Sequence, residues 1–311
     1  MLRDVNTADR GFTMIVVLWV IALLTLILTG FLHSAGTHTG IAVNVRNSAR
    51  AEALADAGVH LAVLDLIQAA GGKTAFAAIV RNSDPRSCRA GPGETITIRI
   101  QDASGRVDLN AANHAMLAAL IAGLGASAAD AATTAAAVID FRDRDSDPLP
   151  GGAEEAGYAA NGLKVSPKNA PFDTVEELEH VFGFTIERVK SLLPHVTVHS
   201  GMSGIDPAAA SPGLITILQT GHLIVSPAGP TPSTSPGRLP PDFAGTSPRQ
   251  TFILTSAAET QNGGRYVREA IVDLSTGRTL DYTFRTWKRG EIFPIDIRKL
   301  AEPPACSGLT G

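Results

Sequence analysis

Cysteine, aromatic residues and an excess of charge of either sign are all scarce in this sequence. The 311 residues include two cysteines, Cys88 and Cys306, which excludes a dense disulfide framework and a zinc site built from CxxC pairs. If the protein is exported, these two can form one disulfide between distant parts of the chain, and two unpaired buried thiols are the alternative. The net charge of −4 argues against a general nucleic-acid-binding surface. Aromatic residues make up 5% of the chain, so we expect helices to dominate outside the C-terminal third.

Sequence features of common catalytic sites are also missing. No Gly-x-Ser-x-Gly occurs, and Gly71-Gly72-Lys73-Thr74 ends like a phosphate-binding loop but lacks the upstream glycine. Four histidines have no cysteine or carboxylate at a spacing that builds a catalytic dyad: His114, His180, His195 and His199. We therefore expect a protein that is not an enzyme.

A long apolar run lies near the N-terminus. Phe12 to Leu32 is 21 residues without a charge, and as a helix it would be about 31 Å long, which matches the hydrocarbon core of a membrane. A polar leader precedes it, with Arg3 and Arg10. One interpretation is a signal peptide or signal anchor. The run is long for a signal peptide, and the residues after it, 33–36, match the Ala-x-Ala cleavage pattern poorly.

The second interpretation is a type IV pilin-like leader. Gly11-Phe12 resembles the site at which prepilin peptidases cut, and these enzymes also methylate the new amino terminus, here Phe12. Pilin-like helices usually carry Glu at the fifth mature position, which here is Val16. A buried carboxylate in lipid needs a partner, and a subunit with no neighbour beyond it needs no such Glu.

The remaining chain alternates between helical and strand patterns. Residues 33–68 continue the helix with an apolar stripe on one side, and Gly71-Gly72 is a plausible end. Glu94 to Gln101 alternates as a half-buried strand that opens after Gly91-Pro92-Gly93. A helical block follows. Its expected helix starts are Asn110, Ser127, Asp173, Thr185, Asp206-Pro207 and Ser211-Pro212.

The C-terminal third turns back to strands. Ser226 to Pro248 is rich in Pro, Ser, Thr and Gly with almost no apolar residue to anchor a core, so we expect an exposed loop. Thr251 to Trp287 reads as three antiparallel strands, with a hairpin signal at Asn262-Gly263-Gly264. The sequence gives no structural prediction for the tail, Glu291 to Gly311. Strands on both sides of a helical block indicate one sheet with a helical insertion.

These pieces, in this order, resemble the general secretion pathway protein K family. The matching motifs are the Gly11-Phe12 leader with Val17-Leu18-Trp19-Val20, Gly105 to Ala111, Asp140 to Asp145, Gly152-Ala153-Glu154 with Tyr158, Pro171-Phe172-Asp173 with Glu177-Leu178, Gly204-Ile205-Asp206 and the terminal meander. The resemblance covers most of residues 10–290. Phe141 departs from the family, in which Trp is commoner at this position.

The resemblance implies an α+β fold: a pilin-like domain, with a long N-terminal transmembrane helix packed on an antiparallel sheet, and an inserted all-α domain of two sterile-alpha-motif-like halves. The implied segments are a prepilin leader at 1–11, a membrane helix at 12–32, the first pilin-like part at 33–106, the helical insertion at 107–225, a Pro/Ser-rich loop at 226–249, and C-terminal strands and tail at 250–311.

The implied function is that of a minor pseudopilin at the tip of the type II secretion pseudopilus, acting in assembly of that filament and in protein export. Its implied partners are the I- and J-type minor pseudopilins, the prepilin peptidase and the inner membrane, with the bulk of the chain in the periplasm and no nucleic acid bound.

An acidic loop is the strongest candidate for a ligand site. Asp143, Asp145, Asp147 and Glu154 reproduce positions 1, 3, 5 and 12 of an EF-hand, but Pro148 replaces the glycine of position 6, which excludes a true EF-hand. Crowded carboxylates still suit a hard cation, and Asp140, Glu155 and backbone carbonyls would complete its shell. Calcium in the inserted domain is also what the resemblance implies. The alternative is a solvated acidic loop neutralised by Arg142 and Arg144.

A second motif admits a rival function. Phe172 to Leu193 resembles a helix-hairpin-helix, which grips nucleic-acid backbone, but its turn Phe182-Gly183-Phe184 lacks the first glycine and glutamates surround it. We therefore expect a packing scaffold. A membrane-anchored nucleic-acid-binding module of a DNA-uptake system remains a rival function. A type IV pilus minor pilin and a signal-anchored calcium protein are two others.

Overall fold

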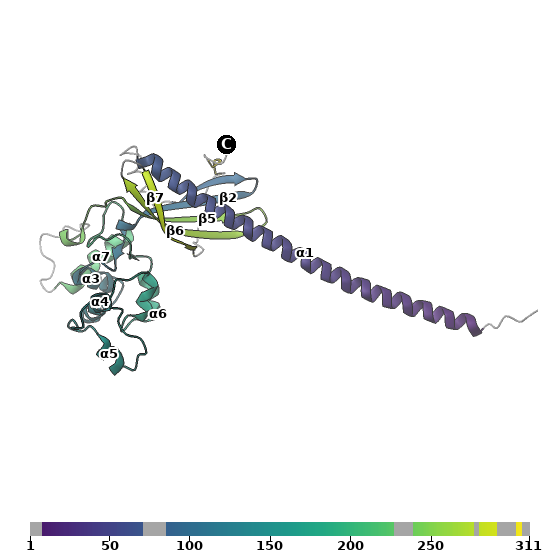
Figure 1. Ribbon diagram of the computed structural model, residues 1–311, viewed down its shortest axis with the longest axis horizontal. Coiled ribbons are helices and arrows are strands. Elements are labelled where there is room, and N and C mark those ends of the chain that lie inside the picture. Colours follow the sequence, from purple (N-terminus) through teal and green to yellow (C-terminus); the bar gives the residue numbers. More distant parts are fainter. Residues whose placement is uncertain (1–7, 71–84, 227–238, 277–279, 291–302, 307–311) are drawn as a thin grey trace, which may run out of the picture.

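A single helix of 63 residues, α1 (Ala8–Ala70), organises the molecule. The computed structural model describes residues 8–70, 85–226, 239–276, 280–290 and 303–306. At 1.5 Å per residue α1 is about 95 Å long, and its N-terminal half projects away from the rest of the chain (Figure 1). The helix begins inside the predicted leader, and its described part runs through Gly30, Gly40 and Gly58 without a break.

The C-terminal half of α1 packs on an antiparallel sheet of five strands (Figure 1). Their spatial order is β1-β2-β5-β6-β7. Their bounds are β1 Arg86–Gly91, β2 Glu94–Asp102, β5 Thr251–Glu259, β6 Arg265–Thr276 and β7 Leu280–Arg289. Strands β2 and β5 are neighbours with Ile98 opposite Ser256, so the helical block between them is an insertion into one sheet, as predicted.

The core between α1 and the sheet is built from the predicted apolar periodicities. Val59, Ala62 and Leu66 are fully buried on one side of α1, and they meet the alternating isoleucines of β2. The helix approaches the sheet closely at Gly58, where an added Cβ would lie 2.6 Å from Ile96 Cγ2. Glycine at this position therefore sets how near the helix axis can come to β2 and β5.

Strand β1 was not predicted. Gly91-Pro92-Gly93 does not open an isolated strand. It forms the turn of a β1–β2 hairpin in which Gly93 has φ +68°. Residues 86–91 contain no run of large apolar side chains, so the strand depends on pairing with β2 rather than on its own pattern. The predicted turn at Asn262-Gly263 does join β5 to β6, with Gly263 at φ +77°.

The insertion forms a separate hydrophobic core beside one end of the sheet (Figure 1). Two short parallel strands, β3 and β4, tie its beginning to its later part through the pair Val107 and Val196. Its elements are η1 Ala103–Gly105, β3 Val107–Asp108, α3 His114–Gly123, α4 Ala128–Arg142, α5 Glu155–Ala160, η2 Val175–His180, α6 Ile186–Leu192, β4 Val196–Thr197, α7 Pro212–Val225 and η3 Pro241–Phe243.

Three of the predicted helix starts are confirmed by their hydrogen bonds. The side chains of Ser127, Thr185 and Ser211 each accept a hydrogen bond from the backbone amide three residues later. The predicted start at Asp206-Pro207 is wrong. The Asp206 carboxylate instead accepts hydrogen bonds from the amides of Ala208 and Ser247, which stabilises a turn.

Two predicted caps are displaced along the chain. Helix α3 is capped by Asn113, because the Asn110 side chain is engaged with both backbone groups of Phe172. The segment expected to start at Asp173 is a 3-10 helix whose capping box uses Thr174 and Glu177. In the first case the Asn110 side chain is bonded to a distant segment, and in the second the cap lies one residue further along the chain.

The Pro-rich segment does anchor a core, which corrects the expectation of an exposed loop over its whole length. Residues 227–238 lie outside the described part of the chain, but Leu239 is 7% exposed and Phe243 is 2% exposed within the helical core. The Phe243 ring lies edge-on to His222 at 5.5 Å, and its carbonyl accepts a hydrogen bond from Ile205 N at 2.9 Å. Two apolar residues among many prolines are enough to fasten this segment.

The end of the chain returns to the opposite edge of the sheet. Cys306 forms a disulfide with Cys88 of β1, with their Cα atoms 4.8 Å apart. Arg89 N donates to Pro304 O at 2.8 Å, and Cys306 N donates to Arg89 O at 3.1 Å. The rest of the tail, 291–302 and 307–311, lies outside the described residues.

Candidate functional site

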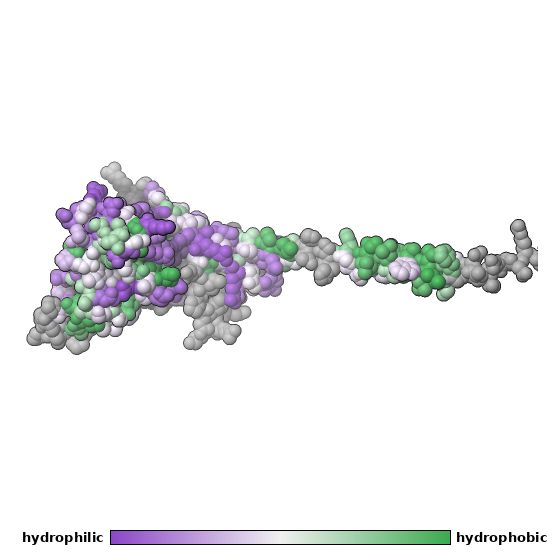
Figure 2. All heavy atoms as spheres, turned by 90° about the horizontal axis from the view of Figure 1, so that it is seen from below, coloured by the Kyte–Doolittle hydropathy of each residue, from purple (hydrophilic) through white to green (hydrophobic). Residues whose placement is uncertain are grey.

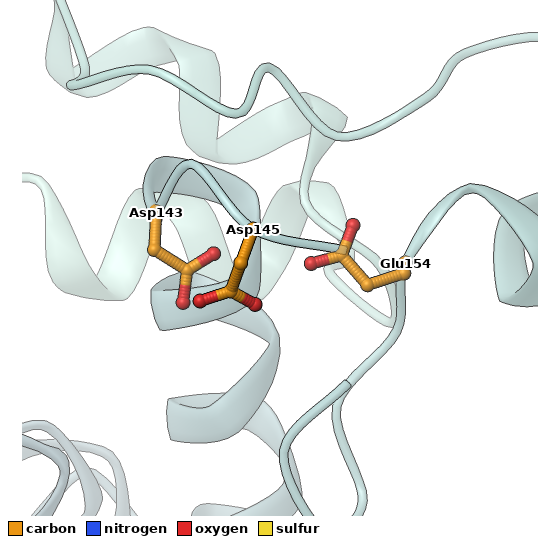
Figure 3. Close-up of side chains that lie close together, drawn as sticks. All are labelled: Asp143, Asp145 and Glu154. Carbon is orange, nitrogen blue, oxygen red and sulfur yellow. The ribbon is translucent and has the colours of Figure 1, made fainter. Parts of the chain in front are cut away.

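Three carboxylates from the acidic loop converge between helices α4 and α5. Asp143 directly follows α4, Asp145 lies two residues later, and Glu154 directly precedes α5 without capping it through its side chain. One oxygen from each lies within 4.8 Å of the others. Figure 3 shows Glu154 reaching from the far side of the loop toward the two aspartates. A single cation placed among them would contact all three.

Asp145 is exposed, but the burial of Glu154 and of one Asp143 oxygen makes the cluster costly without a cation. Glu154 is 5% exposed and neither of its oxygens has a hydrogen-bond partner, and Asp143 Oδ1 is likewise buried and unpaired. Burial, with the surrounding aspartates, raises the pKa of Glu154. Burial and neighbouring Asp145 raise the pKa of Asp143. An isolated buried carboxylate is strongly disfavoured, so the loop has the charge and the free oxygens of a hard-cation site.

The other predicted ligands have different positions. Asp140 is fully buried, and both of its oxygens accept from Leu149 N at 3.2 Å, so it shapes the loop from behind. An added Cβ at Gly152 would overlap this carboxylate, which explains why a glycine lies there. Asp147 and Glu155 are exposed and are not part of the three-carboxylate group. Asp147 N donates to Asp145 Oδ1 at 3.0 Å, which orients that carboxylate.

Neutralisation by Arg142 has little geometric support. Its guanidinium donates to the carbonyl oxygen of Leu109 and, at 2.6 Å, to that of Ala112, so it fastens α4 to the segment before α3. Burial lowers the pKa of Arg142. Arg144 is exposed. The arginines flanking the loop therefore leave the buried oxygens of Asp143 and Glu154 without a hydrogen-bond donor.

One further oxygen near this loop was missed from the sequence. The Asn169 side chain donates from Nδ2 to Asp145 O at 3.3 Å, and its Oδ1 is buried without a partner. Asn169 also has φ +50°, a conformation that Asn tolerates better than most residues. It follows Glu154 by 15 residues and belongs to no spacing pattern, so the sequence carries no signal for it.

The predicted membrane helix has the length and surface of a membrane span. Phe12–Phe31 is 20 residues with a mean hydropathy of 2.7, and none of it is buried against the rest of the chain. Figure 2 shows this apolar surface as a separate rod beyond the polar head. The hydroxyls of Thr25 and Thr29 donate to backbone carbonyls of the preceding turn, so they add no unsatisfied polar group. The Gly11–Phe12 peptide lies inside α1, and Val16 is 44% exposed.

The helix-hairpin-helix-like turn is engaged in packing. Gly183 has φ +76°, and Phe182 N donates to the buried Tyr158 hydroxyl at 2.8 Å instead of facing a ligand. Arg188, the cation beside this turn, donates to Asp130 at 2.6 Å and to Thr134 at 3.0 Å. These contacts fit the scaffold interpretation.

Of the four histidines singled out from the sequence, His114, His195 and His199 are half-buried and His180 is exposed. His114 Nε2 lies 2.9 Å from Ala132 O. Burial lowers the pKa of His195 and of His199. No histidine belongs to a cluster of potential metal ligands in the described part of the chain.

Comparison with known proteins supports the architecture. Residues 98–201, a third of the chain, match the model of a family described as type II secretion system, protein K. Among solved structures, a chain of the GspK-GspI-GspJ complex from the enterotoxigenic Escherichia coli type 2 secretion system matches with a TM-score of 0.55 and 19% identity, over 83% of this chain and 99% of that chain. No curated protein sequence matches.

These findings confirm the predicted fold class and, over residues 98–201, the resemblance to the protein K family. The N-terminal apolar helix, the antiparallel sheet and the helical insertion together form a pilin-like fold with an inserted domain. The division of the insertion into sterile-alpha-motif-like halves stays a prediction.

Proposed function

We propose that this chain is a minor pseudopilin at the tip of the type II secretion pseudopilus, acting in pseudopilus assembly and in protein export across the outer membrane. The observation that carries the proposal is the protein K match over residues 98–201, which covers the end of β2 and most of the insertion that distinguishes this fold from a plain pilin. The mode of action would be packing rather than catalysis, because the candidate site consists of carboxylates that could hold an ion.

The anchor would hold the subunit in the inner membrane, with the head in the periplasm. The span Phe12–Phe31 supports this, because its side chains face away from the rest of the chain and need an apolar environment. A prepilin peptidase would cut between Gly11 and Phe12 and methylate Phe12. The peptide at this site lies inside α1, so cleavage requires the helix to open locally around Gly11.

Val16 supports the tip position. In the pilin-like scheme a Glu at this place pairs with the amino terminus of the next subunit, and an unpaired carboxylate in lipid is costly. An apolar side chain here removes that need. The insertion lies beside the sheet end remote from the membrane span (Figure 1), and it widens the head where a further subunit would otherwise stack. The I- and J-type minor pseudopilins would then bind on the membrane side.

Calcium is the proposed ligand of the insertion. Asp143, Asp145 and Glu154 fit it, because their oxygens converge and several are buried without partners. Calcium takes six to eight oxygens, so backbone carbonyls and water would complete the shell. The ion would neutralise the cluster and fix the connection between α4 and α5.

The mature amino terminus tests the processing step. Mass spectrometry of the protein from its native membrane should give N-methyl-Phe12 as the first residue. An intact Met1, or cleavage near Gly36, would remove the pilin-like scheme altogether.

Co-purification tests the tip assignment. The full-length chain, co-expressed with the I- and J-type subunits of the same secretion system, should elute with them from a detergent column. A chain that stays monomeric beside both would contradict the assignment even if the fold is right. Retention on DNA that falls with salt would instead favour the nucleic-acid rival. If the chain assembles only with the products of a type IV pilus gene set, the minor pilin of that pilus becomes the better assignment.

A further inference from the structure

The Asn169 amide is held in one orientation against the acidic loop. Its backbone N donates to Phe141 O at 3.0 Å, and its Nδ2 donates to Asp145 O at 3.3 Å. The orientation of the amide follows from hydrogen-bond chemistry, because a side-chain oxygen facing the Asp145 carbonyl would place two acceptors against each other. The Oδ1 atom is therefore the end that is buried and without a donor.

The segment that carries Asn169 is anchored by contacts that involve none of the three carboxylates. Three residues later, Phe172 stacks on Phe141 with ring centroids 4.9 Å apart. The Asn110 side chain bonds both the N–H and the carbonyl of Phe172, at 2.7 and 2.9 Å. Asn169 is thus positioned before any ion enters, and its φ of +50° is maintained by this surrounding structure.

A buried amide oxygen without a donor is costly in the same way as the unpaired carboxylates of Asp143 and Glu154. Asp143 directly follows α4 and Glu154 directly precedes α5, and the Asn169 amide donates to the backbone of Asp145, which provides the third carboxylate. A hard cation satisfies carboxylate and amide oxygens alike. One ion would therefore satisfy all of these orphaned atoms together.

We propose that Asn169 supplies a neutral oxygen ligand to the cation held by Asp143, Asp145 and Glu154, an inference that rests on the proposed calcium site. Because the ligand comes from a separate segment, the ion joins residues 143–154 to the chain around Asn169 as well as closing the acidic loop. A neutral fourth ligand also adds an oxygen without adding to the repulsion among three carboxylates.

The test uses the full-length protein in detergent, stripped of divalent cations and titrated with calcium chloride by calorimetry. Asn169→Gly removes the amide and accommodates the positive φ. We expect it to weaken calcium affinity at least tenfold, the lower end of what loss of a supporting group costs a metal site. Asn161→Ala is the matched control, because Asn161 also donates its amide to a backbone carbonyl of this domain, Gly157 O, but lies at the far end of α5. It should bind calcium as the wild type does.

The outcomes separate the two proposals. If the wild type binds no calcium, the metal site and the role of Asn169 both fall. If the wild type binds and Asn169→Gly binds equally well, only the role of Asn169 falls. If Asn169→Gly has lost its thermal unfolding transition, Asn169→Asp decides: it keeps an oxygen at this position and should bind at least as tightly as the wild type, and weaker binding would overturn the inference.

Discussion

The helical insertion depends on a crossing of α3 and α7 so close that their backbones touch, and one methyl group should disrupt it. At Gly221 an added Cβ would overlap the carbonyl oxygen of Ala119 and lie 2.6 Å from its carbonyl carbon and 2.7 Å from Gly123 N. These are backbone atoms of α3, which cannot rotate aside as a side chain would. Gly221→Ala must therefore push the two helices apart.

The expected cost follows from two opposing effects. Overpacking a core costs about 1–3 kcal/mol, and the obstruction by backbone places this case near 3 kcal/mol. Alanine in place of glycine favours the helix by about 1 kcal/mol. The net destabilisation is about 2 kcal/mol, or roughly a thirtyfold change in the ratio of folded to unfolded protein. For a head of this size it lowers the melting temperature by about 4–8 °C.

The assay compares Gly221→Ala with Gly213→Ala by circular dichroism during thermal unfolding in detergent. Gly213 lies in the first turn of the same helix, and nothing is within 4 Å of its added Cβ. This control should be as stable as the wild type or more so. If both variants melt together, the helices do not cross as closely as Gly123 and Gly221 indicate, and the packing argument for the insertion is wrong.

Three other perturbations probe the head. Arg268→Met removes the ion pairs with Glu52 at 2.7 Å and Asp56 at 2.6 Å. Arg268 is 9% exposed but its partners are 47% and 34% exposed, so we expect the free energy of unfolding, measured in urea, to fall by about 2 kcal/mol. Calcium-free protein should lose stability as the pH rises from about 4 through the raised pKa values of Asp143 and Glu154, because the folded state binds more protons than the unfolded state in this range. In thermal melts, added calcium should abolish this loss. A melting temperature that does not change with pH in the absence of calcium would contradict the burial argument. Reducing Cys88–Cys306, which closes 218 residues of sequence, should destabilise the head by up to about 5 kcal/mol, and unchanged unfolding after reduction would show that the tail binds without it.

Local chemistry explains which helix starts were predictable. A hydroxyl can cap a helix by accepting from the free backbone amide three residues later, and this contact depends on nothing distant in the chain. The caps of this kind are Ser127, Thr185 and Ser211. Asn110 and Asn113 are equally suitable caps on sequence grounds. In the structure Asn113 caps α3, whereas the Asn110 side chain bonds Phe172, 62 residues further on. A single sequence contains no trace of that contact.

Strand β1 and the end of the chain show the same limit in the sheet. Residues 86–91 have no alternation of apolar residues, and they form a strand because β2 lies on one side and Ala305 on the other. The Cys88–Cys306 pair could be stated from the sequence only as one of two alternatives. Strands of this kind form because of the segments that they pair with, and those segments can be distant in the sequence.

In the candidate site, too, some residues could be predicted from the sequence and others could not. The EF-hand-like spacing of Asp143, Asp145, Asp147 and Glu154 contained the three carboxylates that converge, because loop ligands of hard cations follow sequence order, but it also included the exposed Asp147, which lies outside the group. Spacing could not separate them from Asp140, which is buried behind the loop, or indicate Asn169. Those two roles depend on how α4 ends and on where the chain returns 15 residues after Glu154.

The position of Glu154 connects the proposed ion to the rest of the insertion. Glu154 is the residue before α5, so whatever fixes its carboxylate fixes the start of that helix. One turn later Tyr158 is fully buried, with burial raising its pKa to about 12, and its hydroxyl accepts the amide of Phe182. Phe182 belongs to the turn between η2 and α6, and η2 reaches the sheet through Glu176 and Lys288, 3.1 Å apart. An exposed ion pair of this kind contributes little stability by itself. Neutralising the buried Glu154 would therefore act on the insertion through α5, Tyr158 and the turn before α6.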